Sequence, residues 1–297
     1  MRTLCLGEAL VDLVCEHPVD GVTDADSFRP HFGGAAANVC VTAARRGARV
    51  ALAGGAGDDA WGRWLRERLG KEGVDRTWFS LVEGAQTPVA FVTVDVAGEP
   101  TFAIYGDGIQ LAVEAVAARL SDAIADTDAL VFASNTLVGT RERKITLAAR
   151  KRALALGRRV IFDPNLRMHR WISASEATDV VGSCIPEAFL VKCNATEARL
   201  LTGQSEPDRA AGELIARGAR NVIVTLGADG AILRGEATAD APGVFARVLN
   251  ATGAGDAFLG TVLAVLSASD CDCDTLAEAL PVAVREAAAA TERWGAI

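Results

Sequence analysis

The feature that most constrains the fold is a repeated alternation between short β-rich runs and stretches with the spacing of amphipathic helices. The expected strands cover residues 3–7, 50–54, 129–133, 160–163, 188–193 and 222–225. The expected helices cover residues 36–46, 60–72, 141–156, 175–182, 209–217, 257–266 and 275–292. Strands that alternate with helices in this way predict an α/β fold, in which a mostly parallel sheet carries helices on both faces.

Two stretches interrupt this alternation, residues 11–32 and residues 88–107. In the second stretch, two alternating runs flank residues 98–100, Gly-Glu-Pro, which predicts an antiparallel hairpin. We interpret both stretches as one small antiparallel β-sheet, inserted in two pieces into a main domain. That main domain comprises residues 1–10, 33–87 and 108–297. Because an antiparallel sheet can present one face to water and the other to a ligand, we expect a lid, with a homodimer contact as its other use.

Charge and composition narrow the class of partner. The chain of 297 residues has a formal net charge of −8, so a basic surface for nucleic acid is not expected. Hydrophobic residues make up 50% of the chain, yet no uncharged apolar run is long enough to span a membrane. The 7 cysteines are scattered, and the C-x-C at residues 271–273 lies in an acidic stretch that indicates a loop rather than a zinc site. We therefore expect a cytoplasmic protein with reduced thiols and small-molecule partners.

A glycine-rich turn, residues 252–255, stands directly before an apolar helical stretch, and Asp256 falls where that helix would begin. Small residues at a helix start leave backbone N–H groups free to hold an anion. The carboxylate of Asp256 could simply cap the helix. If the N–H groups instead hold a phosphoryl group in transit, the same carboxylate is suited to take the proton from an attacking hydroxyl. This second interpretation requires an alcohol as the second substrate.

Two further constellations place polar groups at expected helix starts. Gly33 and Gly34 precede a helix that carries Asn38, and paired glycines can bring N–H groups close to a polyhydroxy ligand. A close-packed strand-to-helix turn is the simpler explanation of the same residues. Asn194 and Glu197, three residues apart, could hold hydrated Mg²⁺ near phosphates. This pair also fits a capping box, which the spacing alone favours.

A strand that ends at Thr225 continues through a turn from Gly227 to Gly230 into another strand. By itself this pattern is an ordinary hairpin, but nucleotides also bind at the carboxyl ends of parallel strands. The sequence has no P-loop signature, no dinucleotide-binding glycine fingerprint after its first strand, no GxSxG and no HExxH. With 3 histidines in the chain, histidine chemistry is not favoured.

In their order and spacing over nearly the whole chain, these stretches resemble the PfkB family of ribokinase-like carbohydrate kinases. Residues 33–38, GGAAAN, resemble its N-terminal signature, and residues 250–256, NATGAGD, resemble its C-terminal signature. Residues 194–197, NATE, are similar to its N-x-x-E motif. The resemblance implies a three-layer α/β/α fold with a small β-sheet lid, an ATP-dependent kinase activity and the use of Mg²⁺.

The resemblance also implies a role for each matching residue. The catalytic base would be Asp256, and the anion hole would be formed by Gly253, Ala254 and Gly255. Mg²⁺ and phosphate would be managed by Asn194 and Glu197. The nucleotide site would be lined by Thr225, Gly227 and Gly230. The sugar hydroxyls would be bound by Asp12, Gly33, Gly34 and Asn38.

Within the family, residues 7–14, GEALVDLV, and residues 162–171, FDPNLRMHRW, look most like the fructokinase branch. By this likeness Arg167 would lie near the transferred phosphate, where a guanidinium is well suited, with a surface arginine as the alternative. Phe102 and Tyr105 on the second lid strand would stack on a sugar, although the arginine and Ala-Asp pair of many fructokinases are missing there.

The C-terminal signature departs from the family pattern at Asn250, where the family usually has Asp. That Asp helps to hold a monovalent cation in several members. Asn250 keeps a carbonyl oxygen but loses the charge, which makes it a weaker candidate ligand for K⁺.

We therefore expect an ATP-dependent sugar kinase with fructose as the first candidate acceptor. Kinases for 2-keto-3-deoxygluconate, ribose or nucleosides are the alternatives within the family. Outside it, a non-catalytic sugar sensor would share the fold, but Asp256 argues against that role.

Overall fold

The computed structural model describes residues 1–106, 108–269 and 274–297. Residue 107, the last of the second expected lid piece, and the C-x-C at 271–273 lie outside these ranges. The strands are β1 (Arg2–Leu6), β2 (Leu10–Val14), β3 (Arg29–Gly33), β4 (Arg49–Gly57), β5 (Phe79–Val82), β6 (Val89–Val94), β7 (Pro100–Tyr105), β8 (Ala129–Ala133), β9 (Arg159–Asp163), β10 (Leu190–Asn194), β11 (Asn221–Thr225), β12 (Gly230–Gly235) and β13 (Ala239–Pro242). The helices are α1 (Ala35–Arg45), α2 (Ala60–Lys71), α3 (Gly108–Glu114), α4 (Leu120–Ala125), α5 (Thr140–Ala155), α6 (Ala174–Gly182), α7 (Ala195–Thr202), α8 (Pro207–Ala216), α9 (Ala254–Ala268) and α10 (Asp274–Thr291).

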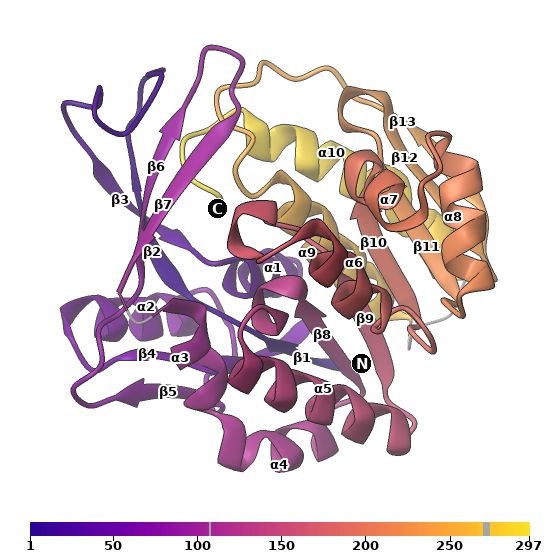
Figure 1. The fold of residues 1–297 in the computed structure, drawn as a ribbon, viewed down its shortest axis with the longest axis horizontal. Helices are drawn as coiled ribbons and strands as arrows, with labels where there is room; N and C mark the ends of the chain where they lie inside the picture. The colour runs from indigo at the N-terminus through magenta and orange to yellow at the C-terminus, as the bar shows by residue number, and fades with distance from the viewer. Residues whose placement is uncertain (107, 270–273) are drawn as a thin grey trace.

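Within the described residues, the large sheet has nine strands in the order β13-β12-β11-β10-β9-β8-β1-β4-β5. All neighbouring strands from β11 to β5 run parallel, and β12 and β13 extend one edge in antiparallel fashion. The parallel strands read as continuous apolar runs because helices cover both of their faces. One apolar cluster joins the sheet to α1, α2, α9 and α10, and a second joins it to α4–α8. This arrangement confirms the predicted α/β architecture (Figure 1).

A second sheet of four strands, in the order β3-β2-β6-β7, stands beside the large one (Figure 1). Its outer pairs are antiparallel, as predicted, and β6 and β7 form the expected hairpin. The central pair, β2 and β6, is parallel, so the sheet is mixed and the prediction of a purely antiparallel sheet was wrong. The reason is that β2 and β6 run in the same direction, and each is followed by an antiparallel neighbour, β3 or β7.

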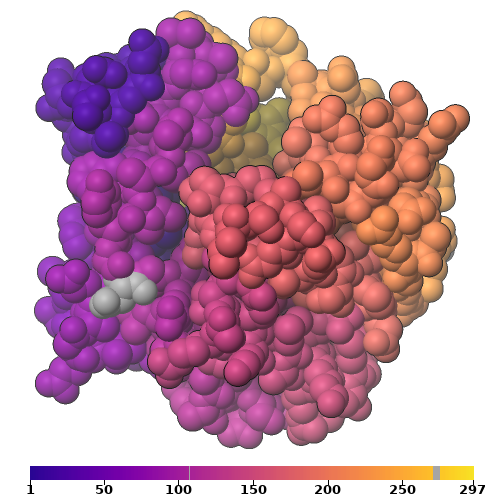
Figure 2. Space-filling view, viewed as in Figure 1, coloured from indigo at the N-terminus to yellow at the C-terminus, as the bar shows by residue number. Residues whose placement is uncertain are grey.

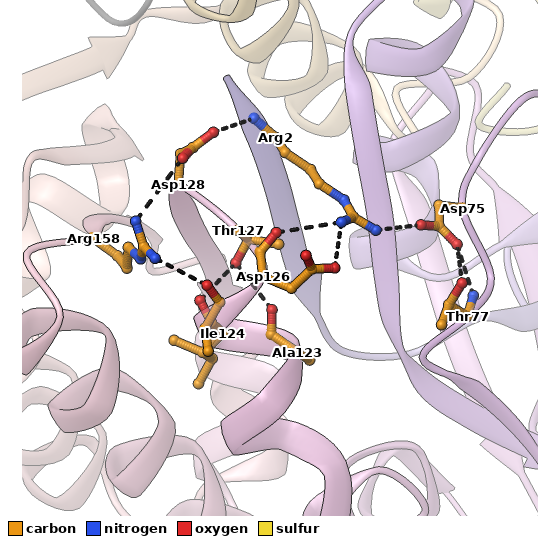
Figure 3. A network of polar contacts seen from close by, with 10 residues as sticks. Arg2, Asp75, Thr77, Ala123, Ile124, Asp126, Thr127, Asp128 and Arg158 are labelled. Atoms are coloured by element: carbon orange, nitrogen blue, oxygen red, sulfur yellow. Dashed lines mark hydrogen bonds and ion pairs between the residues drawn. The ribbon is translucent and has the colours of Figure 1, made fainter.

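The amino ends of the strands are held by an ionic network around Arg2 (Figure 3). The Arg2 guanidinium binds Asp75 at 2.7 Å and also Asp126, while its backbone N–H donates to Asp128 at 2.7 Å. Partly exposed pairs of this kind stabilise a fold weakly. The network therefore connects the segments that begin β1, β5 and β8 at the amino ends of the strands. The polar groups predicted to form a site do not belong to it. In the described part of the chain, no helix combines the length and apolarity that a bilayer crossing requires.

Candidate active site

A cavity of about 270 Å³ lies where the carboxyl ends of the parallel strands meet the small sheet. Figure 2 shows the surface hollowed between the purple region of the small sheet and the red segment that follows β9. Open parallel sheets bind ligands at this edge, because the loops after successive strands converge there. The residues expected from the sequence that line the cavity are Asp12, Gly34, Asn38, Phe102, Arg167, Asn194, Glu197, Thr225, Gly253, Gly255 and Asp256.

One wall of the cavity is the first turn of α9. Gly253 is the N-cap residue and has φ 78°, a left-handed conformation that favours glycine, and no side chain caps the helix. In the described residues, the backbone N–H groups of Gly255 and Asp256 have no acceptor. These N–H groups sit at the positive end of a 15-residue helix, so the turn is suited to hold an anion.

Asp256 stands on this first turn and is 9% exposed. Its Oδ2 accepts a hydrogen bond from Asn38 Nδ2 on α1 at 2.9 Å, and Oδ1 receives none from the described residues. Asp256 therefore does not cap its own helix, which was the simpler alternative. Burial raises the pKa of Asp256 to about 7, against the opposing effects of the Asn38 hydrogen bond and of Lys192. A carboxylate with such a pKa can both hold and release a proton near neutral pH.

Asp12 on β2 forms the second acidic group of the cavity, and it is 3% exposed. Burial, together with the negative charges of Asp256 and Glu8, raises the pKa of Asp12 to about 7. A Cβ on Gly33 would lie 2.2 Å from Asp12 Oδ2, so only glycine leaves room for this carboxylate. Gly34 has φ 99°, and a Cβ there would lie 2.6 Å from the backbone oxygen of Glu8. The paired glycines therefore serve close packing, and this packing sets the position of Asp12.

Asn194 and Glu197 form a capping box at the start of α7. Asn194 Oδ1 accepts the Glu197 N–H at 2.8 Å, and Glu197 Oε2 accepts the Asn194 N–H at 2.9 Å. Glu197 Oε1 also accepts the Leu166 N–H at 2.7 Å. Burial and the charge of Asp163 raise the pKa of Glu197. Asn194 Oδ1 and both carboxylate oxygens of Glu197 therefore each accept one hydrogen bond already. Oxygen atoms are the ligands that Mg²⁺ prefers, and these three fit an ion held through water better than one that they coordinate directly.

Lys192 is a buried cation that the sequence analysis did not single out. It lies on β10, its side chain is 7% exposed, and its Nζ is 3.0 Å from Asp163 Oδ2 at the end of β9. Burial alone would lower the pKa of Lys192, but the carboxylates of Asp163 and Glu197 outweigh that effect and raise it. The side chain is therefore a fixed ammonium ion in the cavity wall.

The strand β7 of the small sheet presents alternate side chains to the cavity, as the period of a strand requires. Pro100, Phe102 and Ile104 line the cavity. Tyr105 is 60% exposed on the other face, where its ring contacts Phe91 with centroids 5.6 Å apart. Phe102 can therefore contact a ligand, whereas the expectation that Tyr105 stacks on a sugar is wrong.

Several residues that line the cavity received no role from the sequence. Lys192 lies in β10, and the others follow β1, β8 or β9: Glu8, Asn135, Asn165, His169 and Arg170. Glu8 accepts hydrogen bonds from the Ala35 N–H at 3.1 Å and from Asn135 Nδ2 at 3.2 Å, and Arg170 donates to Asn135 Oδ1 at 3.1 Å. Most of them could have been predicted from their place in the sequence, because they directly follow an expected parallel strand.

The structure does not bring every expected site residue to the cavity. Gly33, Ala254, Gly227, Gly230 and Asn250 are absent from its lining. A Cβ on Gly230 would lie 2.1 Å from the backbone oxygen of Ala241, so close packing of β12 on β13 accounts for that glycine.

Asn250 is fully buried behind the glycine-rich turn. Its Oδ1 accepts the Thr252 N–H at 2.8 Å, and its Nδ2 has no acceptor in the described residues. Asn250 Oδ1 keeps one free lone pair but carries no formal charge, so it attracts a cation less strongly than the carboxylate usual at this position would. Asn250 therefore stays a weaker candidate ligand for K⁺.

Comparison with known proteins agrees with this geometry. Residues 2–297 match the family model described as pfkB family carbohydrate kinase. Fructokinase-2 of Solanum habrochaites is 31% identical over 259 residues, which cover 86% of this chain and 79% of that protein. Aminoimidazole riboside kinase of Salmonella typhimurium is 34% identical over 280 residues, which cover 93% of this chain and 84% of that protein.

Among solved structures, a double mutant of fructokinase from Vibrio cholerae, in a form bound to fructose, ADP and potassium ion, superposes with a TM-score of 0.84. The two chains are 31% identical, and the match covers 100% of this chain and 94% of that one. The sequence relatives are named kinases, so a phosphotransferase with an alcohol acceptor is the activity that the likeness supports. The chain belongs to the pfkB family of carbohydrate kinases.

Proposed function

We propose that this carbohydrate kinase transfers the γ-phosphoryl group of ATP to a hydroxyl of a sugar, with fructose as the first candidate. The observation that carries the proposal is the meeting of three features in one cavity. These are a buried carboxylate, Asp256, unpaired N–H groups on the first turn of α9, and a small sheet that presents Phe102 from the opposite side.

In the proposed reaction, the sugar hydroxyl lies against Asp256, and Asn38 and Asp12 hold neighbouring hydroxyls. Asp256 takes the hydroxyl proton while the hydroxyl oxygen forms a bond to the γ-phosphorus. The bond between that phosphorus and the β,γ-bridging oxygen breaks, and its electron pair leaves with ADP. The N–H groups of Gly255 and Asp256 stabilise the charge on the transferring group, whereas that of Ala254, part of the anion hole expected from the sequence, already donates to the backbone oxygen of Ala251 at 3.3 Å. The small sheet acts as a lid that excludes water, which would otherwise accept the phosphoryl group.

ATP would lie along the carboxyl ends of β10 and β11, where Asn194 and Thr225 line the cavity. Gly227, in the turn after β11, would border the nucleotide farther from the reacting atoms. Bound Mg²⁺ supplies positive charge that neutralises the phosphates. Asn194 and Glu197 would hold it through water, as their occupied oxygens suggest. Arg167, which also lines the cavity, would bind a phosphate oxygen.

Fructose is preferred as the acceptor because the Solanum habrochaites relative and the Vibrio cholerae structure described above, each 31% identical to this chain, are both fructokinases. A riboside is the second candidate, because the Salmonella typhimurium relative is named for aminoimidazole riboside and matches 93% of this chain. Kinases for 2-keto-3-deoxygluconate or ribose remain as further alternatives. The outer face of the small sheet, which carries the exposed Tyr105, would be the contact in a homodimer.

The deciding experiment is a panel of acceptors with ATP and Mg²⁺, in which release of ADP is measured by a coupled assay. Fructose, 2-keto-3-deoxygluconate, ribose and nucleosides are compared at equal concentration, each with and without K⁺. We expect fructose to give the highest kcat/KM. Turnover of nucleosides alone would replace fructose by a riboside, and binding of sugars without any ADP release would favour the non-catalytic sensor.

A further inference from the structure

The buried ammonium of Lys192 has a hydrogen-bonding capacity that the protein does not use. An ammonium group has three N–H donors, and only Asp163 Oδ2, at 3.0 Å, accepts one of them in the described part of the chain. Buried donors are nearly always paired. Because Lys192 also lines the cavity, its remaining donors are placed to meet a ligand there.

The position of Gly255 defines which part of the cavity the ammonium reaches. A Cβ built on Gly255 would lie 3.0 Å from Lys192 Nζ. Gly255 belongs to the first turn of α9, and its own N–H has no acceptor in the described residues. The lysine charge and the positive helix end therefore converge on one point. An anion at that point would be held by backbone donors from one side and by an ammonium from the other.

A purely structural role explains less of this arrangement. Lys192 could serve only to neutralise Asp163, because either charge alone would be costly to bury. However, apolar side chains often replace a buried ion pair without loss of stability. Neutralisation of Asp163 also does not explain why two N–H donors of Lys192 are unused, or why its Nζ lies beside Gly255.

We propose that Lys192 is a catalytic residue that donates hydrogen bonds to the γ-phosphoryl group during its transfer, and that Asp163 is the positioning residue that fixes the ammonium. The proposal rests on the kinase function proposed above. Lys192 keeps its own protons throughout, since the proton of the sugar hydroxyl goes to Asp256 and the electron pair of the broken P–O bond goes to ADP. Its contribution is a fixed charge that complements the phosphoryl oxygens.

The test uses Lys192→Met, which keeps the length of the side chain and removes the charge. Binding of AMP-PNP, ADP and fructose is measured by titration calorimetry, and kcat is measured by release of ADP. We expect affinity for AMP-PNP to fall about 10- to 100-fold, as for loss of a charged hydrogen bond, while affinities for ADP and fructose change less than about 2-fold. We expect kcat to fall about 10²- to 10³-fold. Equal weakening of AMP-PNP, ADP and fructose would contradict the proposal, as would a kcat within about 3-fold of the parent.

The double variant Lys192→Met with Asp163→Asn separates catalysis from charge balance. It leaves no unpaired buried charge at this position, so we expect its melting temperature to lie near that of the parent even if the single variant unfolds. Its kcat and its affinity for AMP-PNP should remain low. Recovery of both in the double variant would show that Lys192 only balances Asp163 and would overturn the proposal.

The two proposals fail in different ways. If the parent protein releases no ADP with any acceptor, the kinase function fails, while the contrast between AMP-PNP and ADP still tests Lys192. If the parent is active and Lys192→Met keeps its activity, the kinase function stands and the role of Lys192 is lost.

Discussion

Replacement of the buried carboxylate by an amide, Asp256→Asn, should make the protein more stable and nearly inactive. The pKa of Asp256 is raised to about 7, against about 3.9 for an aspartate in an unfolded chain. The folded state therefore holds the proton more tightly, and stability is lost as the pH rises from about 4 through 7. At about 1.36 kcal/mol for each pH unit, the raised pKa of Asp256 lowers the free energy of unfolding by about 4 kcal/mol at pH 8 and by about 1.5 kcal/mol at pH 5, relative to low pH where the carboxyl group is protonated in both states.

An amide has no charge to bury, so Asp256→Asn escapes this cost, and its Oδ1 can still accept the hydrogen bond from Asn38. Any contribution of the amide that does not depend on pH cancels when the two pH values are compared. We therefore expect the gain in the free energy of unfolding to be about 2–3 kcal/mol larger at pH 8 than at pH 5.

Urea denaturation followed by tryptophan fluorescence at both pH values measures this difference. The control is Asp122→Asn, an exposed aspartate on α4, for which we expect no such gain. In the same preparation, fructose binding should persist while kcat falls about 10²- to 10⁴-fold, the usual contribution of a general base. A stability gain that is equal at the two pH values would refute the argument that burial of this carboxylate sets its pKa.

Three further predictions concern residues in or next to the cavity. Because Asp256 must be ionised to accept a proton, kcat/KM of the parent should rise about tenfold for each pH unit below about 7 and level off above it, and a flat profile from pH 5.5 to 9 would contradict this role. Gly33→Ala would place a Cβ against the Asp12 carboxylate, so the KM for fructose should rise by at least about tenfold with a smaller change in kcat. The control is Gly182→Ala, whose added Cβ meets no neighbouring atom and should leave KM and kcat unchanged. Because Asn250 carries no charge to attract K⁺, replacing Na⁺ by K⁺ should change the rate less than about 2-fold in the parent, and Asn250→Asp should create activation by K⁺, measured as the ratio of kcat in the two salts.

The architecture could be predicted because its signals are local. Each parallel strand is an apolar run, and each large helix shows its own periodicity, so the order of elements is visible in the sequence. The short elements β5 and β13 were missed, because four residues carry too little pattern to stand out. The parallel pairing of β2 with β6 was also missed, since it joins segments far apart in the chain.

The site was predictable where glycine reports a constraint on the backbone, as at Gly34 and Gly253. The site was not predictable where the role of a side chain depends on residues that are distant in the sequence. Lys192 stands in a strand between apolar residues, and nothing in that segment indicates that Asp163 and Gly255 surround it. Conversely, Gly230 looked like a ligand-binding glycine, but it is required by contact between two strands.

The hydrogen bond between Asn38 and Asp256 joins residues that are 218 positions apart. A ribosome-bound nascent chain that has emerged only as far as α8 already contains most of the large sheet, but it lacks α9, the helix that carries Asp256. The contact between Asn38 and Asp256 can therefore form only after nearly the whole polypeptide has been synthesised. A ligand that binds only the folded protein raises the free energy of global unfolding. We therefore expect bound substrate to stabilise the whole molecule and not one part of it.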